Sequence, residues 1–332
     1  MKRITFLNTH TQEIETFLTW NSLITSTSSL MSRLSFFIVS LIGFILVLFS
    51  FAQAQSGWTQ AQNEGYFKLN QSSIRAGQFF NPDGNLIDIT TTSVYSTVLY
   101  GEYGVNDRLT ALVNAQLFVR GTINKLESTV DGTIIPGDEF NGLGEIQLGL
   151  KYGIVKEGPI VLSASGQVKL PSGANVGGET ELLQTGDGAW GAIGMIHASH
   201  SFYPKPLYAN LSAGYQWRGT ADLAYTSGLV SVNYDDAFVW SGELGWLPNE
   251  HWVLAFKWTQ VQPFGANSSE GVTGSSSIFG NRLTYFAIIP EVNYITSKNW
   301  GVSVSAGGVL SARNILAAPS FNVGIFYQLK LS

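Results

Sequence analysis

The segment Asp236–Gln260 reads DAFVWSGELGWLPNEHWVLAFKWTQ and decides the fold of this chain. Large apolar side chains occupy alternate positions on both sides of a central Pro-Asn-Glu turn, and mostly small or polar side chains stand between them. Alternation of period two on both sides of a turn predicts a β-hairpin. Two tryptophans mark each end of the apolar stripe, Trp240 with Trp258 and Trp246 with Trp252. Indole rings at both ends of an apolar band are typical of strands that cross a membrane between two water interfaces.

The composition of the chain agrees with a membrane-embedded β protein. Of its 332 residues, 45% are hydrophobic, 13% are aromatic and only 12% are charged, against about 25% charged in an ordinary soluble domain. Cysteine is absent, which excludes a disulfide framework and thiolate chemistry. The net charge of −5 and the lack of a basic block argue against nucleic acid as a partner.

The start of the chain predicts a signal peptide. Arg33 is followed by an apolar run, Leu34–Phe51, and then by Ala52-Gln53-Ala54. A basic residue, an apolar run and an A-x-A site form a secretory signal peptide. The alternative is a membrane anchor, because the run reaches the lower length limit of a spanning helix. The A-x-A site favours cleavage after Ala54, so we expect residues 1–54 to be an extension and signal peptide, and residues 55–332 to be the exported domain.

The alternation of the opening hairpin recurs along the chain and predicts twelve strands. Besides the two strands of that hairpin, they are residues 65–76, 92–105, 108–119, 142–155, 159–170, 187–202, 207–218, 282–296, 300–311 and 321–331. Their connections alternate between short and long, as in barrels with short periplasmic turns and long external loops. The stripe from Leu207 to Trp217 is about 33 Å long and rises about 25 Å at a tilt of ~40°, which matches the apolar band of such barrels. We therefore predict an all-β fold, a transmembrane antiparallel up-and-down β-barrel of about twelve strands.

A soluble β-sandwich or lipocalin-like barrel is the alternative fold. A small soluble barrel encloses apolar side chains, whereas here the second face of each strand is polar. If the apolar stripe faces lipid, the polar face lines the lumen. The charged residues of that face are Lys68, Glu102, Glu145, Lys151, Lys169, Glu243, Lys257, Glu291 and Lys330. Seven tryptophans are expected at the membrane interfaces: Trp190, Trp217, Trp240, Trp246, Trp252, Trp258 and Trp300.

Acidic and basic residues of the lumen face are nearly balanced. Folding the hairpins about Glu157 and Glu250 sets Glu145 opposite Lys169 and Glu243 opposite Lys257. Ion pairs that brace the interior are one interpretation of this balance, and a charged lining that steers solutes is the other.

Signals for catalysis are weak. His197 and His200 have a spacing that suggests metal ligands, but a separation of three residues on a strand sends two side chains to opposite faces. We expect His197 to face the lumen and His200 to face outward near the periplasmic rim. The chain shows no G-x-S-x-G nucleophile motif, and G-L-G at residues 142–144 is not followed by a helix. We therefore expect no enzymatic activity, no cofactor and no metal.

Several motifs carry a resemblance to a known family. They are GLGEIQLGLKYGI at 142–154, VKLPSG at 168–173, TGDG at 185–188 and LSAGY at 211–215. The chain resembles the outer-membrane proteins of the MetA-pathway of phenol degradation family over residues 142–258. The resemblance implies an outer-membrane location and uptake of small hydrophobic or aromatic molecules. Compared with the related long-chain fatty-acid transporters, this chain has fewer strands, and residues 55–64 are too few for their N-terminal plug.

These observations lead to one main hypothesis and two alternatives. The main hypothesis is a channel or transporter for small solutes in the outer membrane of a Gram-negative bacterium. Its partners are then the lipid bilayer, the barrel-assembly machinery and a small-molecule solute. The first alternative is a structural or surface-interaction barrel without transport, whose long loops bind a partner. The second is an outer-membrane enzyme.

Overall fold

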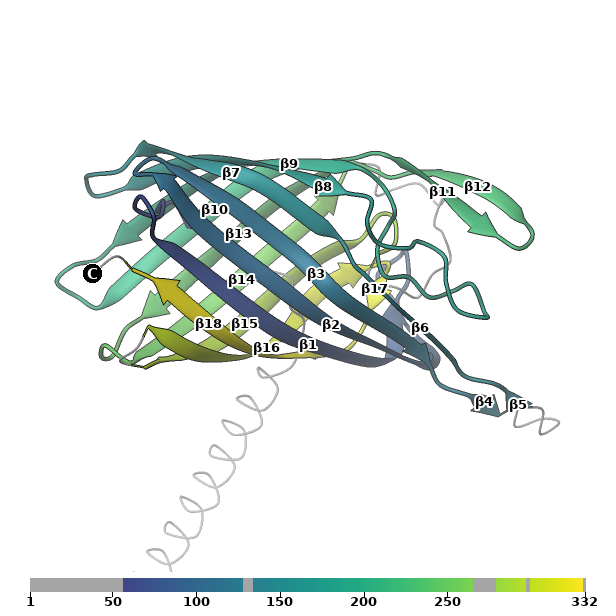
Figure 1. Ribbon diagram of the computed structural model, residues 1–332. Helices are drawn as coiled ribbons and strands as arrows, with labels where there is room; N and C mark the ends of the chain where they lie inside the picture. Colours follow the sequence, from purple (N-terminus) through teal and green to yellow (C-terminus); the bar gives the residue numbers. More distant parts are fainter. Residues whose placement is uncertain (1–55, 128–133, 265–278, 297–298, 331–332) are drawn as a thin grey trace, which may run out of the picture. The chain divides into compact units, whose positions relative to one another are not determined.

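The computed structural model describes residues 56–127, 134–264, 279–296 and 299–330. Within these residues twelve long strands pair with their neighbours in chain order and close into an antiparallel barrel (Figure 1). They are β1 (Gly65–Phe80), β2 (Leu86–Asn106), β3 (Leu109–Ile123), β7 (Ile146–Val155), β8 (Val161–Leu170), β9 (Gly191–Ser201), β10 (Leu207–Arg218), β13 (Ala237–Trp246), β14 (Trp252–Pro263), β15 (Thr284–Ile295), β16 (Trp300–Arg313) and β18 (Ser320–Leu329). Because β1 pairs with both β2 and β18, the sheet closes on itself. The predicted fold class is confirmed.

The two ends of the barrel differ in the length of their connections. At one end, which we call the turn end, only a few residues join β2 to β3, β7 to β8, β9 to β10, β13 to β14 and β15 to β16. At the other end, the loop end, β1 and β2 are also joined by a short connection, but the remaining connections are long and carry the short strands (Figure 1). These are β4 (Leu126–Glu127), β5 (Ile134–Ile135), β6 (Asp138–Gly142), β11 (Thr220–Tyr225), β12 (Gly228–Asn233) and β17 (Ile315–Leu316). Short turns face the periplasm in such barrels, which identifies the turn end as the periplasmic one.

The predicted strand boundaries are wrong mainly at the loop end. Strand β2 begins at Leu86 instead of residue 92, and β3 continues to Ile123, where it pairs with β6 inside a predicted loop. Two other predicted loops hold the β11–β12 hairpin and β17. Beyond the apolar band both faces of a strand meet water, so the backbone ladder continues while the alternation of side chains fades. Alternation therefore locates the membrane-spanning part of each strand better than its ends.

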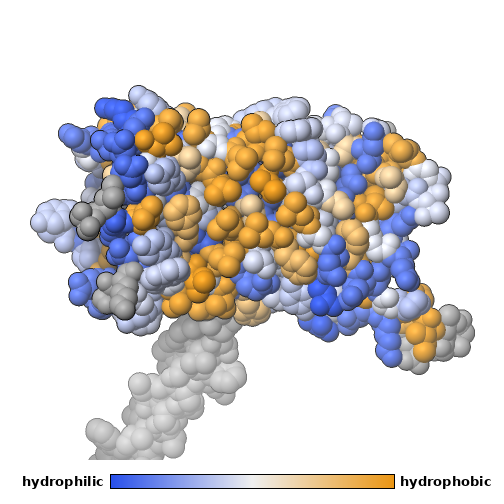
Figure 2. Space-filling view, in the orientation of Figure 1, coloured by the Kyte–Doolittle hydropathy of each residue, from blue (hydrophilic) through white to orange (hydrophobic). Residues whose placement is uncertain are grey.

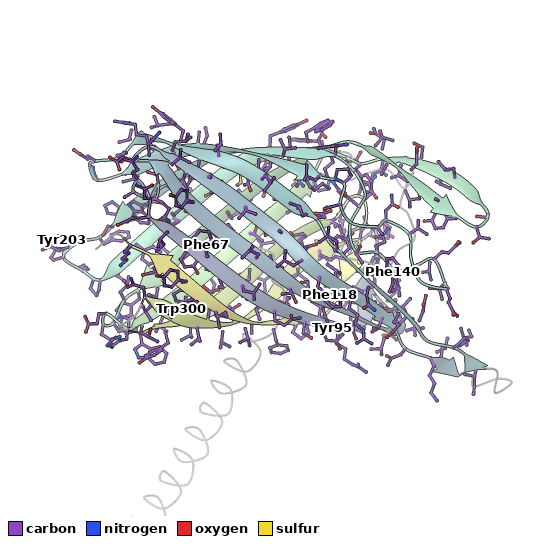
Figure 3. The ribbon with its side chains drawn as sticks, in the orientation of Figure 1. Phe67, Tyr95, Phe118, Phe140, Tyr203 and Trp300 are labelled. Atoms are coloured by element: carbon purple, nitrogen blue, oxygen red, sulfur yellow. The ribbon has the colours of Figure 1, made fainter. Side chains whose placement is uncertain are left out.

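The barrel has an apolar outer surface and a polar interior. On β7, Leu148, Leu150 and Tyr152 are 47%, 51% and 51% exposed, whereas Lys151 between them is 0% exposed. Figure 2 shows hydrophobic residues gathered in a band across the middle of the barrel, with hydrophilic residues toward its ends. Aromatic side chains lie near both ends of the wall, including Phe67 and Trp300 on the turn side and Phe118 on the loop side (Figure 3). A surface of this kind fits a lipid bilayer.

The interior becomes apolar toward the loop end. Inward positions of β1 change from Lys68 and Ser72 to Ile74 and Ala76 along the strand. The last two belong to a buried cluster made of Ile74, Ala76, Val94, Val119, Phe279, Ala287, Val309, Ala312, Ile315, Leu316 and Ala318. Within the described part of the chain, no helix has the length and apolarity needed to cross a membrane. The predicted signal peptide, in residues 1–54, lies outside the described residues.

Candidate functional site: the barrel interior

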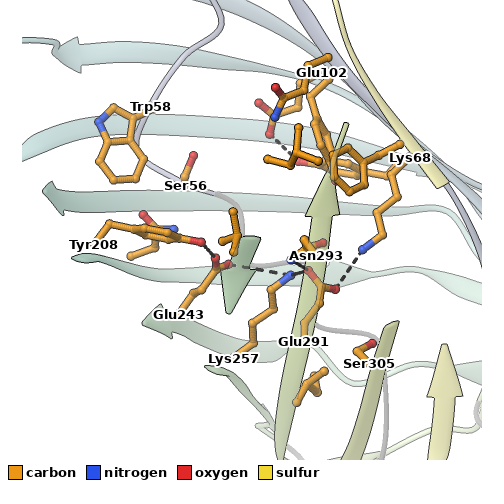
Figure 4. A pocket seen from close by; sticks show the side chains of 18 of the residues that line it. Ser56, Trp58, Lys68, Glu102, Tyr208, Glu243, Lys257, Glu291, Asn293 and Ser305 are labelled. Carbon is orange, nitrogen blue, oxygen red and sulfur yellow. Dashed lines mark hydrogen bonds and ion pairs between the residues drawn. The ribbon is translucent and has the colours of Figure 1, made fainter. Parts of the chain in front are cut away.

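A cavity of about 820 Å³ occupies the turn end of the barrel (Figure 4). Its wall is formed by inward side chains of several strands, by the start of the described chain at Ser56 and by the turn at residues 203–206. We call it the turn-end cavity. Its volume is within the range typical of ligand-binding cavities, about 300–1,000 Å³.

A chain of ion pairs crosses this cavity. Glu291 on β15 accepts hydrogen bonds from Lys68 on β1 (Nζ–Oε2, 2.9 Å) and from Lys257 on β14 (Nζ–Oε1, 2.8 Å). Glu243 on β13 lies 4.0 Å from the Lys257 ammonium and accepts a hydrogen bond from the Tyr208 hydroxyl of β10. These side chains are buried or nearly so. Two lysines and two glutamates leave the cluster without net charge (Figure 4).

A second pair stands beside this cluster, on β2 and β7. Lys151 Nζ lies 3.0 Å from Glu102 Oε2 and donates to the backbone carbonyl of Ser56 at 3.3 Å. The Tyr100 hydroxyl and the Gln60 side-chain amide also donate to Glu102. A buried charge is tolerated when it is paired and its remaining lone pairs are bonded, and both conditions hold here.

Residues 56–64 run along the inner wall at the turn end. The Gly57 amide donates to Ser199 Oγ at 2.7 Å, and the Gln60 amide donates to Thr110 Oγ1 at 2.9 Å. Gly104 on β2 allows this approach, because a Cβ atom there would stand 1.9 Å from the Ala61 carbonyl oxygen. The sequence indicated that residues 55–64 are too few for the plug of fatty-acid transporters. The described part of this segment nevertheless contributes Ser56, Trp58 and Gln60 to the cavity wall.

A smaller cavity of about 260 Å³, the loop-end cavity, lies on the loop side of the first. Residues 171–190 fold inward beside it, so that Thr185 is 0% and Asp187 is 2% exposed. Asp187 forms ion pairs with Lys169 and with Arg218 (Nη2–Oδ2, 3.1 Å), and Lys169 also lies 3.3 Å from Glu145. Asn114 and Gln116 of β3 line both cavities. The two cavities are therefore arranged in series along the lumen.

The structure places most of the predicted charges inside the barrel and pairs them. The register predicted for the opening hairpin is confirmed, since Glu243 faces Lys257. The register predicted for the other pair is wrong, because Gln147 is the residue opposite Lys169. The pairs from Gly153 onward centre on residue 158 instead of Glu157, which displaces Glu145 by two positions, and it reaches Lys169 diagonally. Lys330 lies beyond β18 and is exposed.

Some lumen residues were not singled out from the sequence. Arg218 and Tyr208 lie on the polar face of β10. The alternation of side chains along this strand was therefore sufficient to assign both residues to the lumen. Tyr66 and Tyr100 reach the cavity from the polar faces of β1 and β2 in the same way. Asp187 could not be assigned to the lumen in this way. It lies in the connection between β8 and β9, which has no alternating pattern that would indicate its inward path.

The seven tryptophans and the two histidines lie on the predicted sides of the wall. Trp190, Trp217, Trp246, Trp252 and Trp300 are exposed, and Trp240 and Trp258 are half-buried. His197 is buried, with its ring nitrogens 2.8 Å from Ser165 Oγ and 2.7 Å from Ser212 Oγ. His200 contacts the Pro159 carbonyl and the Phe202 ring near the rim. Whether the tryptophans act as interface anchors stays a prediction.

A closed barrel with a lipid-compatible exterior and a polar, charge-paired interior defines a transmembrane β-barrel of the outer-membrane type. The chain belongs to the family described as "Putative MetA-pathway of phenol degradation", whose model matches residues 57–323.

Among solved structures, the chain is similar to the COG4313 outer membrane channel from Pseudomonas putida F1, with a TM-score of 0.58, 13% identity, and coverage of 85% of this chain and 100% of that one. The NanC porin matches with a TM-score of 0.47 and 11% identity, over 80% of this chain and 100% of that one. The Ralstonia pickettii toluene transporter TbuX matches with a TM-score of 0.38 and 13% identity, over 84% and 92%. These neighbours are channels, porins and transporters. The comparison with curated proteins finds no match.

Proposed function

We propose that the protein is an outer-membrane channel or transporter for small solutes, and that its solutes are hydrophobic or aromatic. The observation that carries the proposal is the pair of cavities in series inside a closed barrel whose outer surface is apolar. A barrel that served only as a scaffold could fill its interior with side chains, as small eight-stranded barrels do. Export through a signal peptide cleaved after Ala54, and insertion by the barrel-assembly machinery, belong to the same proposal.

The lumen charges favour uncharged solutes over ions. The ion-pair cluster of the turn-end cavity and the one beside the loop-end cavity each contain two basic and two acidic side chains. An ion that enters must compete with an existing pair, whereas a neutral molecule leaves the pairs intact. We therefore assign these charges to bracing of the lumen, and solute steering is the alternative that selectivity measurements test.

The apolar lining at the loop end supports a hydrophobic or aromatic solute. Apolar side chains of Phe279, Leu283 and Ile315 line the loop-end cavity. The description of the family, which refers to phenol degradation, agrees with this solute class.

Liposome swelling tests the proposal directly. Proteoliposomes that contain the full chain are exposed to isotonic solutions of small aromatic alcohols, sugars and amino acids. We expect swelling with the aromatic alcohols at a rate above that of protein-free liposomes, and slower swelling with sugars. Equal rates with and without protein for every solute would contradict transport and favour the surface-interaction alternative.

A further inference from the structure

An open pocket of about 490 Å³ lies on the outer wall of the barrel, at the loop end of β2, β3 and β6. We call it the outer-wall pocket. Tyr95, Arg120 and Glu139 contribute to its lining, and in the ladder Tyr95 lies opposite Arg120. Arg120 points outward, because Val119 before it belongs to the buried interior cluster. Among the described residues, the pocket shares no lining residue with either lumen cavity.

The pocket begins where the apolar outer surface of β3 ends. Phe118 is exposed on the outer face, and Arg120 follows it two residues later on the same face. Two residues of a strand tilted by ~40° rise about 5 Å. Phe118 and Tyr95 both lie toward the loop end of the wall (Figure 3), and hydrophilic residues replace the hydrophobic band there (Figure 2). Because the loop end is external, the pocket lies at the level of the lipid head groups of the outer leaflet.

Arginine distinguishes this sector of the external interface. Besides Arg120 on β3, Arg75 on β1 is exposed on the outer face, where it lies opposite Ser93 of β2. At the loop end of β9 and β10, the exposed outward residues are Trp190 and Trp217 instead. An indole ring suits the interface of any lipid, whereas a guanidinium group binds phosphate oxygens in a planar, bidentate geometry. The sector from β1 to β3 is therefore suited to a phosphate-bearing head group.

Arg120 retains most of its capacity to donate hydrogen bonds. Its Nη2 atom donates to Glu139 Oε2 at 2.5 Å, and the two side chains remain 45% and 58% exposed. A guanidinium group has five N–H donors in a fixed fork, so the ion pair with Glu139 orients the group and leaves other donors for a ligand. The Tyr95 hydroxyl is available beside it, in the same pocket.

The acidic residues of the pocket favour a sugar phosphate over a simple anion. Asp138 also lines the pocket and accepts hydrogen bonds from the amides of Glu179 and Thr180, at 3.1 and 2.9 Å. Glu139 is bonded to Arg120 through one of its carboxylate oxygens. Carboxylates repel a bare phosphate, but they accept hydrogen bonds from hydroxyl groups. An arginine beside two carboxylates thus matches a head group that carries both phosphate and hydroxyl groups.

The wall on the membrane side of the pocket is apolar. Leu69 on β1 and Phe118 on β3 are exposed on the outer face. A polar pocket directly above an apolar surface fits an amphipathic molecule whose chains lie along the wall, and a soluble sugar phosphate would leave that surface unused.

We propose that the outer-wall pocket is a binding site for a phosphorylated glycolipid of the outer leaflet. Its phosphate binds to Arg120, with Arg75 beside it, its sugar hydroxyl groups donate to Glu139, and its acyl chains lie along Phe118. This site goes beyond the proposed transport, since it lies outside the lumen and binds lipid whether or not the lumen conducts.

Native mass spectrometry of the full chain, released from uncharged detergent micelles, tests this site. The probes are lipid A, the same lipid without its phosphates, and phosphatidylglycerol. We expect lipid A to bind about tenfold more tightly than its dephosphorylated form, because hydrogen bonds to a charged group are lost. Phosphatidylglycerol should bind more weakly than lipid A. Equal binding of lipid A with and without phosphates, or of lipid A and phosphatidylglycerol, would overturn the proposal.

A competition experiment separates a lipid from a soluble sugar phosphate. We expect glucose 1-phosphate in large excess to leave bound lipid A in place, because it has no acyl chains to bury against the wall. Displacement of lipid A by glucose 1-phosphate would show that the head group alone determines binding and would reject a lipid as the ligand.

Two variants and one control locate the site. Arg120→Gln and Arg75→Gln should each weaken lipid A binding about fivefold to tenfold and leave binding of the dephosphorylated lipid unchanged. Lys156→Gln, in the exposed turn between β7 and β8, removes a positive charge at the opposite end and should bind like the wild type. Heat-modified migration in gel electrophoresis verifies that each variant folds. Unchanged lipid A affinity in folded Arg120→Gln protein, or an equal loss in Lys156→Gln protein, would exclude this pocket.

Discussion

At the scale of single residues, Glu291 holds the charges of the turn-end cavity together. Its two carboxylate oxygens receive one lysine each, Lys68 at 2.9 Å and Lys257 at 2.8 Å. Glu243 is 4.0 Å from Lys257 and bonds to Tyr208 instead. Glu291 thus forms the shortest ion pair of each lysine, and among the described residues it is the carboxylate that pairs with Lys68.

Glu291→Gln should destabilise the barrel more than any other single loss of charge in this cluster. The variant leaves Lys68 without a carboxylate partner, and breaking a buried pair costs about 3–5 kcal/mol. Guanidinium unfolding of the protein in lipid vesicles measures the change. Glu250→Gln, in an exposed turn where the side chain is 87% exposed, is the control and should differ from the wild type by less than about 0.5 kcal/mol. Equal stability of the two variants would show that the lysines need no partner.

The residues of this cluster could be predicted individually but not as a network. The alternation of side chains along each strand places Lys68, Lys257 and Glu291 on the lumen face. The register of the hairpin places Glu243 opposite Lys257. The contact between Lys68 and Glu291 joins strands that are not neighbours in the sheet. Which side chains meet across a lumen depends on the curvature and stagger of the closed barrel, which a single sequence does not encode in any local pattern.

At the scale of elements, the segment 56–64 narrows the turn-end mouth. It is held by hydrogen bonds from Gly57, Gln60 and Lys151, and by the ring of Trp58, which meets Tyr208 edge to face at 6.1 Å. Its close passage over β2 requires the absence of a side chain at Gly104.

Gly104→Val should increase single-channel conductance by moving this segment away from the wall. The added Cβ atom would meet the Ala61 backbone, which cannot remain in place. Planar-bilayer recordings at fixed salt measure the conductance. Gly166→Val on β8 is the control, because nothing lies within 4 Å of a Cβ atom at that position. Unchanged conductance in the Gly104 variant would mean that residues 56–64 do not limit the pathway.

A second element-scale contact responds to pH outside the membrane. The Thr226 amide, in the turn of the β11–β12 hairpin, donates to the Glu181 carboxylate at 2.6 Å, and the Thr226 hydroxyl donates to the same oxygen. Hydrogen bonds from the Thr226 hydroxyl and then from its amide lower the pKa of the Glu181 carboxyl below its ordinary value. Stabilisation of the hairpin against residues 171–190 is therefore fully present above the ordinary pKa of a glutamate and is lost as the pH falls through the lowered value.

We expect the amide NMR shift of Thr226 to titrate with a midpoint below the ordinary pKa of a glutamate side chain, about 4.3. Glu181→Gln removes the titrating group and should abolish this transition while other loop amides keep theirs. A midpoint at or above 4.3 in the wild type would contradict the contact.

Elements of the membrane-spanning wall were predictable, whereas elements at the loop end were not. Lipid on one side and lumen on the other impose strict alternation, which is why β7, β10 and β14 were located from side-chain parity. Residues 171–190 obey no such rule, since both their inward path and the burial of Asp187 depend on partners far away in sequence.

At the scale of the whole molecule, the apolar band determines where the barrel can reside. Leu211 lies near the middle of β10 on the outer face and is 53% exposed. Tyr203 lies in a turn beyond the band and is 87% exposed (Figure 3).

Leu211→Arg should destabilise the membrane-inserted barrel by about 2–4 kcal/mol, because an arginine at the bilayer midplane costs that much in such barrels. Tyr203→Arg should cost roughly 0–1 kcal/mol. Unfolding titrations in bilayers of one lipid measure both values. Equal costs at the two positions would contradict the assignment of the outer surface to lipid.

The contact between Lys68 and Glu291 also bears on how long the folded barrel persists. It joins residues 223 positions apart and crosses the seam where β1 meets β18, so it forms only after the first and last strands have paired. An interaction that arises after the folding transition state slows unfolding and leaves the rate of folding nearly unchanged. The Glu291 carboxylate, which neutralises two lysines in the lumen, therefore also links strands on the two sides of the junction between β1 and β18. Its loss should shorten the lifetime of the closed barrel without slowing its assembly.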